Sequence, residues 1–174
     1  MILGILSDTH GSVPNKLLEH FKGVDYILHA GDIGDKMVLA VLETVAPVVP
    51  VRGNIDEFGI ADAIVHITRC DKKITIVHNA GDIIHPARDL YTRVLTKPCD
   101  ILISGHYHAW WVQTITMPNG APVLWLSPGA AGNLGHHQTR TAMRLSIRDE
   151  SLQDGSLDDY KLERIELGPR EMCW

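Results

Sequence analysis

Short apolar runs alternate with amphipathic segments at the start of the chain. The runs at 2–7, 24–29 and 48–51 are rich in Ile, Leu and Val, and they are as short as buried strands usually are. Between them, residues 14–20 and 35–42 repeat apolar positions at helical spacing. This β-α-β-α-β order predicts a parallel sheet with right-handed crossovers.

Strands dominate the remainder of the chain. Residues 63–68 and 73–78 flank the turn RCDKK and predict a hairpin, whereas residues 87–95 have helical spacing. The acidic segment 148–159 is predicted to be a solvated turn. Further strands are predicted at 101–104, 111–117, 123–127, 139–147 and 160–166. Two mixed β-sheets packed face to face, with helices outside, fit this order better than one doubly wound sheet, and we expect a single α/β domain over 1–174.

Composition limits the classes of function that the chain can serve. Hydrophobic residues make up 45% and charged residues 21% of the 174 residues, which is typical of a globular protein. A net charge of -5 argues against duplex nucleic acid as a partner. No apolar run reaches the ~18 residues that span a bilayer, and nothing at the N-terminus resembles a secretory signal. Three widely spaced cysteines favour a reducing compartment, so we expect a cytoplasmic protein.

Polar residues follow five of the apolar strands at the point where each strand ends. In an open α/β sheet, ligands bind beyond the carboxyl ends of the strands. Glycines precede three of these polar residues and allow the backbone to approach a ligand closely. The oxygen and nitrogen donors at these ends are Asp8, His10, Asp32, Asn54, His78, His106 and His108.

This donor set favours divalent metal ions. Mixed oxygen and nitrogen ligands without a thiolate suit manganese, iron, nickel or zinc. Seven donors exceed the need of one tetrahedral ion, and they suit two ions that share a carboxylate and clamp a displacement at phosphorus. Each residue alone is more often a helix cap, a turn residue or a buried imidazole. Those readings do not predict all seven donors in this order.

The motifs Asp8-x-His10, Gly31-Asp32, Gly53-Asn54, His78 and Gly105-His106-x-His108 resemble those of the calcineurin-like metallophosphoesterases. Within that superfamily the chain is most similar to the small phosphodiesterases of the YfcE type, whose fold Vps29 shares. The resemblance implies a four-layer α/β/β/α sandwich with the metal site at the ends of the sheets.

The resemblance also implies which residues hold each of two divalent ions. We expect manganese as the metal, with iron, nickel or zinc as alternatives. Asp32 would bridge the ions, and a water or hydroxide held there would be the nucleophile, so the chain supplies no protein nucleophile. The first ion would be held by Asp8, His10, Asp32 and His108. The second ion would be held by Asp32, Asn54, His78 and His106.

The sequence departs from the family pattern at two positions. Many members have a histidine after Gly-Asn that donates a proton to the leaving group, and here that residue is Ile55. The general acid is therefore absent, as it commonly is in the YfcE-like subgroup. The resemblance to this subgroup favours small phosphodiesters over monoesters as substrates. After His78, the usual Gly-His is replaced by Asn79-Ala80-Gly81.

Several other residues carry weaker expectations. The segment LSPGAAGNLGHHQTR at 126–140 corresponds to a loop near the substrate in the family, so the resemblance makes Ser127, His136, His137 and Arg140 candidates for contact with phosphate; an ordinary surface loop explains them equally well. Arg52 is a further candidate that a cap of its strand also explains, and Asn79 is a candidate for hydrogen bonding near the metals. The roles of four histidines stay open, although His29 suits the orientation of a ligand; these are His29, His85, His136 and His137.

The predicted function is hydrolysis of a small phosphoester. The alternatives are a phosphomonoesterase, a hydrolase of another ester and a Vps29-like scaffold for protein interactions. A scaffold has no need for all seven donors, so they favour an enzyme. A homo-oligomer is compatible with the sequence.

Overall fold

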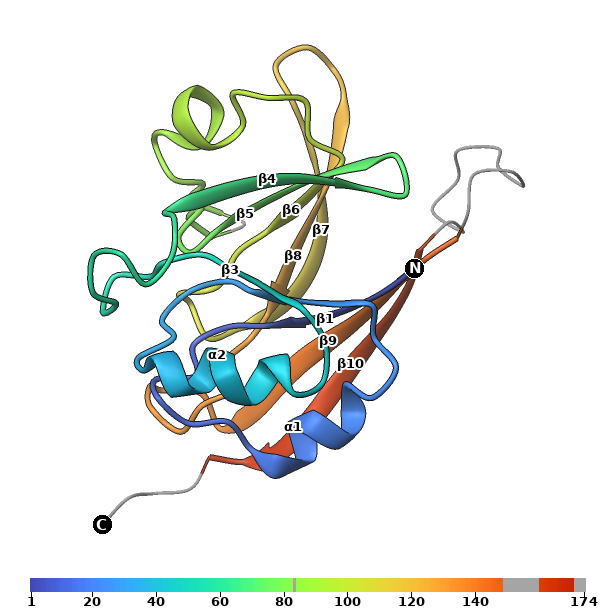
Figure 1. Cartoon of the computed structure of the whole chain (residues 1–174). Helices are drawn as coiled ribbons and strands as arrows, with labels where there is room; N and C mark the ends of the chain where they lie inside the picture. Colours follow the sequence, from blue (N-terminus) through green and yellow to red (C-terminus); the bar gives the residue numbers. More distant parts are fainter. Residues whose placement is uncertain (83, 149–159, 171–174) are drawn as a thin grey trace.

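Two five-stranded sheets lie face to face in the computed structural model (Figure 1), which describes residues 1–82, 84–148 and 160–170. The first sheet has the order β10-β9-β1-β2-β3, in which β1, β2 and β3 are parallel and β9 and β10 are antiparallel to their neighbours. Its strands and the helices between them are β1 (Ile2–Leu6), α1 (Asn15–His20), β2 (Tyr26–His29), α2 (Lys36–Glu43), β3 (Val48–Pro50), β9 (Thr139–Ile147) and β10 (Tyr160–Pro169).

The middle of the chain forms the second sheet, in the order β4-β5-β6-β8-β7. Its three central strands, β5, β6 and β8, are parallel, and the two edge strands are antiparallel. The strands are β4 (Ile64–Arg69), β5 (Lys72–Val77), β6 (Ile101–Ile103), β7 (Trp110–Thr116) and β8 (Pro122–Pro128). The two mixed sheets confirm the predicted sandwich.

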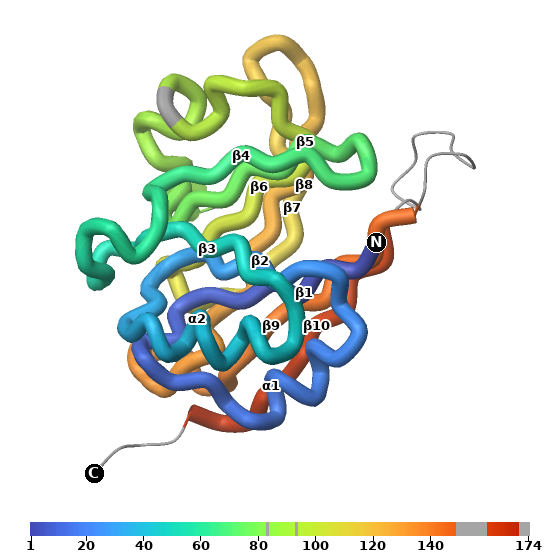
Figure 2. The backbone as a smooth tube through the Cα atoms, viewed as in Figure 1, coloured from blue at the N-terminus to red at the C-terminus, as the bar shows by residue number. Residues whose placement is uncertain are grey.

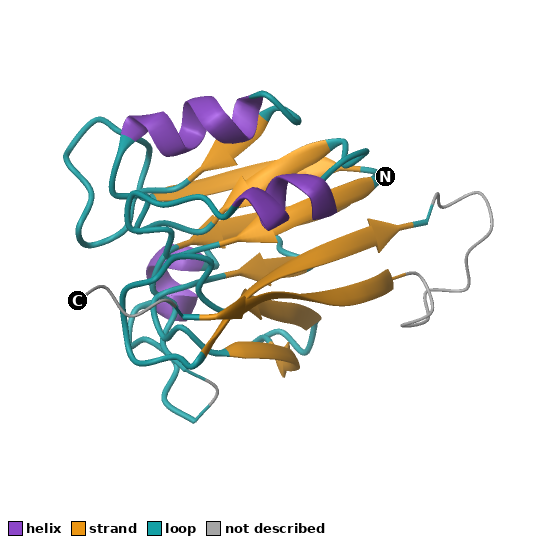
Figure 3. Ribbon diagram, turned by 90° about the horizontal axis from the view of Figure 1, so that it is seen from below, coloured by secondary structure: helices purple, strands orange, loops and turns teal. Residues whose placement is uncertain are grey.

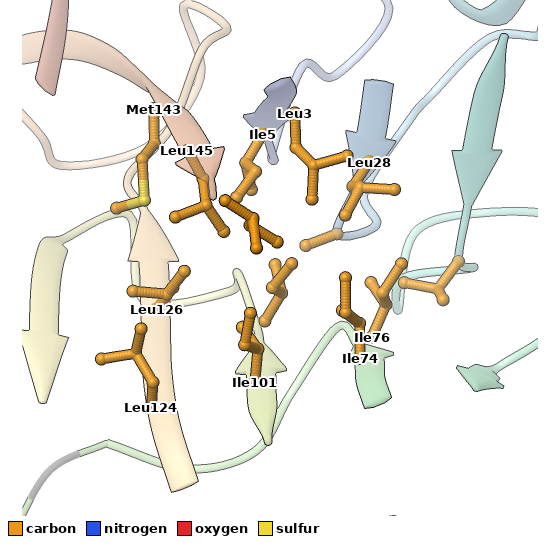
Figure 4. Packing of buried hydrophobic residues seen from close by; sticks show 14 residues of the cluster. Leu3, Ile5, Leu28, Ile74, Ile76, Ile101, Leu124, Leu126, Met143 and Leu145 are labelled. Carbon is orange, nitrogen blue, oxygen red and sulfur yellow. The ribbon is translucent and has the colours of Figure 1, made fainter. Parts of the chain in front are cut away.

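Apolar side chains from both sheets meet in a shared core (Figure 4). Leu3, Ile5 and Leu28 project from the first sheet toward Ile76 and Leu126 of the second, and all five side chains are fully buried. Because successive side chains of a strand point to opposite faces, the residues between them face outward and contact the helices. This core fixes how the two sheets are placed relative to each other.

The helices cover the two outer faces unequally. Figure 3 shows α1 and α2 on one side of the molecule, where Leu17 of α1 and Leu42 of α2 are buried in a cluster on the outer face of the first sheet. Asp35 caps α2, because its carboxylate accepts the backbone N–H of Met37 at 2.7 Å. No helix in the described residues has the length and apolar character needed to cross a membrane.

The helix expected over 87–95 is wrong as a full α-helix. Within the described residues, one π-helix covers the second sheet, η1 (Leu90–Val94), whose Leu90 and Val94 pack with Trp125. Tyr91, Thr92 and Val94 have low helix propensity, which explains why the helical spacing produces only one turn. The predicted acidic turn lies almost wholly outside the described residues.

The loops that follow the parallel strands gather at one end of the sandwich. In Figure 2, β1 runs from the marked N-terminus toward the opposite side of the view, where the loop after β3 also lies. The loops after β1 and β6 meet there, since the backbone N–H of His106 donates to Asp8 Oδ2 at 3.1 Å. The topology therefore brings the predicted donors of both sheets together.

His29, the last residue of β2, connects the loops after β1 and β2. Its Nδ1 accepts the Gly31 N–H at 3.2 Å, so the neutral ring donates from Nε2 to the Thr9 hydroxyl at 2.9 Å. The Thr9 hydroxyl in turn donates to the carbonyl of Ile33 at 2.9 Å. The ring is fully buried, and burial lowers the pKa of His29 to about 4. A neutral imidazole thus holds both loops.

We predict that Leu126→Ala destabilises the protein by about 2–5 kcal/mol, because it removes buried methyl groups and leaves a cavity between the sheets. The matched control is Leu134→Ala, which truncates a side chain that is 55% exposed and should change stability by less than about 0.5 kcal/mol. Urea unfolding of both variants measures the difference. Equal effects of the two substitutions would contradict the proposed core.

We predict that His29 makes stability depend on pH. Its folded pKa of about 4 lies below its ordinary value of 6.5, so the unfolded chain binds the proton first and stability falls as the pH drops from 6.5 toward 4. Wild type should lose about 2 kcal/mol more than His29→Gln between pH 7 and pH 5. Urea unfolding of both proteins in a chelating buffer tests this, and parallel pH profiles would refute it.

Candidate metal centre

Five of the seven predicted donors have an unusual backbone conformation. Non-glycine residues rarely adopt a positive φ, and such residues cluster at functional sites where the surrounding structure holds them. The φ angles are 55° for Asp8, 47° for His10, 53° for Asp32, 75° for His106 and 55° for His108. The left-handed conformation turns the chain sharply at the ends of β1, β2 and β6 and directs these side chains toward one another.

Asp8, His10 and His108 form the first group of donors. One ligand atom from each lies within 4.8 Å of the others, and Asp8 Oδ1 is 3.2 Å from His108 Nε2. Asp8 is fully buried. Asp8 Oδ1 and His10 Nε2 are buried atoms without a hydrogen-bond partner. Buried polar atoms are nearly always paired, and these two are of the type that binds a divalent cation, so they fit a metal ion.

Asp32, Asn54, His78 and His106 form the second group. His78 Nε2 is 3.3 Å from Asp32 Oδ1 and 3.0 Å from Asn54 Oδ1. His106 Nδ1 is 3.1 Å from the same Asn54 oxygen. Asp8, Asp32 and His78 also place ligand atoms within 4.8 Å of one another. Two imidazoles, an amide oxygen and a carboxylate therefore converge as a second set of possible metal ligands.

Asp32 lies between the two groups. While its Oδ1 faces His78, its Oδ2 is 4.0 Å from His10 Nε2 in the first group. This placement is compatible with the predicted bridging role. Asp8 belongs to the first group, and it also places a ligand atom within 4.8 Å of those of Asp32 and His78 in the second. The structure thus brings all seven predicted donors together, and their role as metal ligands stays a prediction.

The carboxylates and histidines perturb one another in the metal-free protein. Burial lowers the pKa of His78, but its hydrogen bond to Asp32 and the charges of Asp8 and Asp32 raise the pKa above its ordinary value overall. Burial raises the pKa of Asp32, and the hydrogen bond and charge of His78 outweigh that effect and lower it. Burial and the neighbouring His78 lower the pKa of His106. The site therefore favours a charged Asp32 carboxylate beside a protonated His78.

Backbone contacts orient His78. Its Nδ1 lies 2.8 Å from the carbonyl oxygen of Ala30, which can only accept a hydrogen bond. Nδ1 therefore carries a proton, and Nε2 is the atom that faces Asp32 and Asn54. A hydrogen bond of this kind fixes the tautomer and orientation of a metal-binding imidazole.

Asp56 supports the site and was not predicted from the sequence. Its carboxylate accepts backbone N–H groups from Ile33 at 3.1 Å, Gly34 at 2.8 Å and Gly53 at 2.8 Å. These contacts join the loops after β2 and β3, which carry Asp32 and Asn54. The available signal was an aspartate three residues after a glycine, a spacing that suits a side chain binding the backbone of its own turn.

A glycine is required at position 53 because the backbone there lies very close to Asp32. A Cβ atom at this position would lie 2.0 Å from Asp32 Oδ1 and 2.2 Å from the Asp32 nitrogen. Any side chain would displace Asp32. The Gly-Asn pair at the end of β3 therefore serves both the turn and the approach of Asn54 to the site.

Two cavities flank the donors and share His106. One, of about 360 Å³, is lined by Arg52, Asn54, His78, Asn79 and His106 among others. The Arg52 guanidinium stacks on the ring of Phe58, 3.9 Å from its centroid. Asn79 Oδ1 accepts the Gly81 N–H at 2.9 Å, which leaves its amide nitrogen available to a ligand. Arg52 and Asn79 are thus beside the candidate metal ligands.

The second cavity, of about 470 Å³, lies on the other side of the His106–His108 turn. It is lined by Tyr107, Ala109, Gly135, His136 and His137 as well as by the two histidines of the turn. Burial lowers the pKa of His137. The segment around Ser127 was expected near substrate, and it is the later residues of that segment that border the site.

The other weak candidates lie elsewhere. The Ser127 hydroxyl is buried and donates to the Ala109 carbonyl at 2.7 Å, and buried Arg140 contacts the carbonyl oxygen of Leu167 at 3.4 Å. Neither residue lines the two cavities beside the donors. His85 is exposed, and its Nδ1 lies 3.6 Å from Asp82 Oδ1. The contacts of Ser127 and Arg140 with substrate stay predictions, and the side chain of His85 has a local contact with Asp82.

Comparison with known proteins agrees with this geometry. Residues 1–150 match the model of the calcineurin-like phosphoesterase superfamily domain. A probable metallophosphoesterase of Methanocaldococcus jannaschii is 34% identical over 159 residues, which cover 86% of this chain and 78% of the relative.

Solved structures share the fold. A mutant of Vps29 from Entamoeba histolytica has a TM-score of 0.71 at 25% identity, covering 95% of this chain and 99% of that one. A structure described as a novel archaeal phosphodiesterase has a TM-score of 0.70 at 23% identity, with the same coverage. From the family match and the archaeal relative, we conclude that the chain belongs to the calcineurin-like phosphoesterase superfamily.

Proposed function

We propose that this protein is a dinuclear metallophosphoesterase that hydrolyses small phosphodiesters. The observation that carries the proposal is the convergence of seven oxygen and nitrogen donors, two of which end in buried atoms without a hydrogen-bond partner. Family membership supports hydrolysis of a phosphoester as the reaction.

The two groups of donors would hold one ion each. Asp8, His10 and His108 would bind the first ion, and Asn54, His78 and His106 the second, with Asp32 between them. When bound, the two ions would supply a nucleophilic water at neutral pH and neutralise phosphate oxygens. We propose manganese first, since the donors include no thiolate, with iron, nickel or zinc as alternatives.

The remaining residues favour a particular class of ester. Arg52 would attract the phosphate, and Asn79 would donate to it from the adjacent cavity. The side chain of Ile55 has no proton to donate to a leaving group, and it is 50% exposed beside Asn54. The best substrates are therefore esters whose leaving group needs no protonation, such as an aryl oxide. The two cavities that share His106 leave room for both substituents of a diester.

The competing function is a scaffold for protein interactions. One structural neighbour is Vps29 and another is described as a phosphodiesterase, so the fold is compatible with either function. The complete set of donors favours the enzyme, because a scaffold gains nothing from five residues held at positive φ. A cytoplasmic location is also proposed, and Cys70 and Cys99 are both free thiols.

We predict that purified protein contains divalent metal and hydrolyses bis(p-nitrophenyl) phosphate faster than p-nitrophenyl phosphate when manganese or nickel is added. Asp8→Asn and His106→Ala each remove a ligand, and each should lower the rate roughly 100-fold or more. Metal content is measured by elemental analysis and rates by release of nitrophenolate.

His20→Ala serves as the control, because it removes a histidine on α1 away from the donors and should leave the rate unchanged. If wild type binds no divalent metal, or is no faster than Asp8→Asn on either ester, the enzyme proposal fails. The Vps29-like scaffold would then be the better account.

We predict that Ile55→His extends the range of leaving groups. An imidazole beside Asn54 can donate a proton, so hydrolysis of an alkyl aryl diester at the alkyl oxygen should accelerate by up to roughly 100-fold. Loss of an aryl oxide needs no acid and should change little. Ile55→Leu is the matched control. An equal acceleration of alkyl and aryl release, or none for either, would show that the missing acid does not limit this enzyme.

A further inference from the structure

His137 contacts the side of the His108 ring that faces away from the other donors. Its Nδ1 lies 3.2 Å from His108 Nδ1, and the two rings are nearly perpendicular. Its second nitrogen, Nε2, lies 3.0 Å from the carbonyl oxygen of Gly132. His108 Nε2, at the opposite end of that ring, lies 3.2 Å from Asp8 Oδ1. The three groups form a chain that ends at the donor cluster.

The direction of each hydrogen bond in this series follows from the Gly132 carbonyl, at which the series begins. The Gly132 carbonyl can only accept, so His137 Nε2 donates to it. The neutral His137 ring then has an acceptor at Nδ1, and His108 Nδ1 must supply the proton between the two rings. His108 therefore carries its proton at Nδ1, which leaves an unprotonated Nε2 directed at Asp8. A metal ion binds that form of the ring.

The segment that carries His137 is anchored to the site on several sides. The Gly132 N–H donates to the Asp8 carbonyl at 3.0 Å, and Arg170 donates from Nη1 to the Gly135 carbonyl at 2.6 Å. Gly135 has a φ of 118°, and a Cβ there would lie 2.0 Å from His108 Nδ1. The segment is shaped around the His108 ring, and His137 provides its polar contact with that ring.

We propose that His137 is a positioning residue that holds His108 in the tautomer and orientation needed to bind a metal ion. This inference rests on the proposed metal centre and adds a residue from outside the seven donors. His137 itself does not contact substrate or metal in this account. Its function is to accept one hydrogen bond from His108 Nδ1, which no apolar residue can do.

The first test is the tautomer of His108 in metal-free protein. Long-range proton–nitrogen NMR spectra of wild type should show His108 protonated at Nδ1 and His137 protonated at Nε2. In His137→Leu the acceptor is lost, and His108 should show a mixture of both tautomers. If His108 in wild type is protonated at Nε2, the proposal is wrong.

The second test is metal affinity, measured by titration of metal-free protein with Mn²⁺ in a calorimeter. His137→Leu should weaken the tighter manganese site by roughly 10- to 100-fold. His137→Asn places an amide oxygen close to the position of Nδ1, so it should recover most of that loss. His20→Leu, on α1 away from the donors, should leave the affinity unchanged.

The pattern across the variants separates positioning from simple packing. Equal losses in His137→Leu and His137→Asn would overturn the proposal, because the hydrogen-bond acceptor would then be irrelevant. If His137→Leu fails to fold, the wild-type tautomer and the affinity of His137→Asn still decide. Failure of the metal-centre proposal would appear differently, as wild type that binds no Mn²⁺ while its NMR spectra still show the tautomers given above.

Discussion

The donor cluster depends on backbone conformations that the chain would not adopt by itself. Asp8, His10, Asp32, His106 and His108 all have positive φ angles, and each such residue costs on the order of 1–3 kcal/mol. These residues follow strands whose inward-facing side chains are fully buried between the sheets. The core therefore stabilises the strand ends, and the strand ends impose the strained turns that carry the donors.

Hydrogen bonds between loops complete what the core begins. Asp56 joins the loops after β2 and β3, and His29 joins those after β1 and β2 through Thr9. His106 binds Asp8 through its backbone, which connects the second sheet to the first. The contacts through Thr9 and His29 also satisfy buried polar groups that would otherwise lack partners. The same network that satisfies the loops also fixes the distances among the donors, so stability and site geometry are coupled.

Much of the site could be predicted because it depends on a simple relation between sequence and topology. Parallel strands place their carboxyl ends at one edge, so the order of strands alone predicts that Asp8, Asp32 and Asn54 meet. The supporting residues follow no such relation. Asp56 and His137 act through the conformation of their loops, and nothing in the sequence shows that Asp56 reaches the loop after β2 or that His137 contacts the His108 ring. Ser127 lies in the expected segment, but the alternation of β8 turns its hydroxyl to Ala109.

The position of Ile55 shows how the scaffold separates structural and chemical roles. Its backbone N–H donates to Asp32 Oδ1 at 3.2 Å, so this residue helps to hold the carboxylate between the two groups of donors. That contact is independent of the side chain, which is half exposed. A histidine or an isoleucine at this position can therefore maintain the same arrangement of donors. The side chain at this position can therefore change without disturbing the contact between the backbone and Asp32.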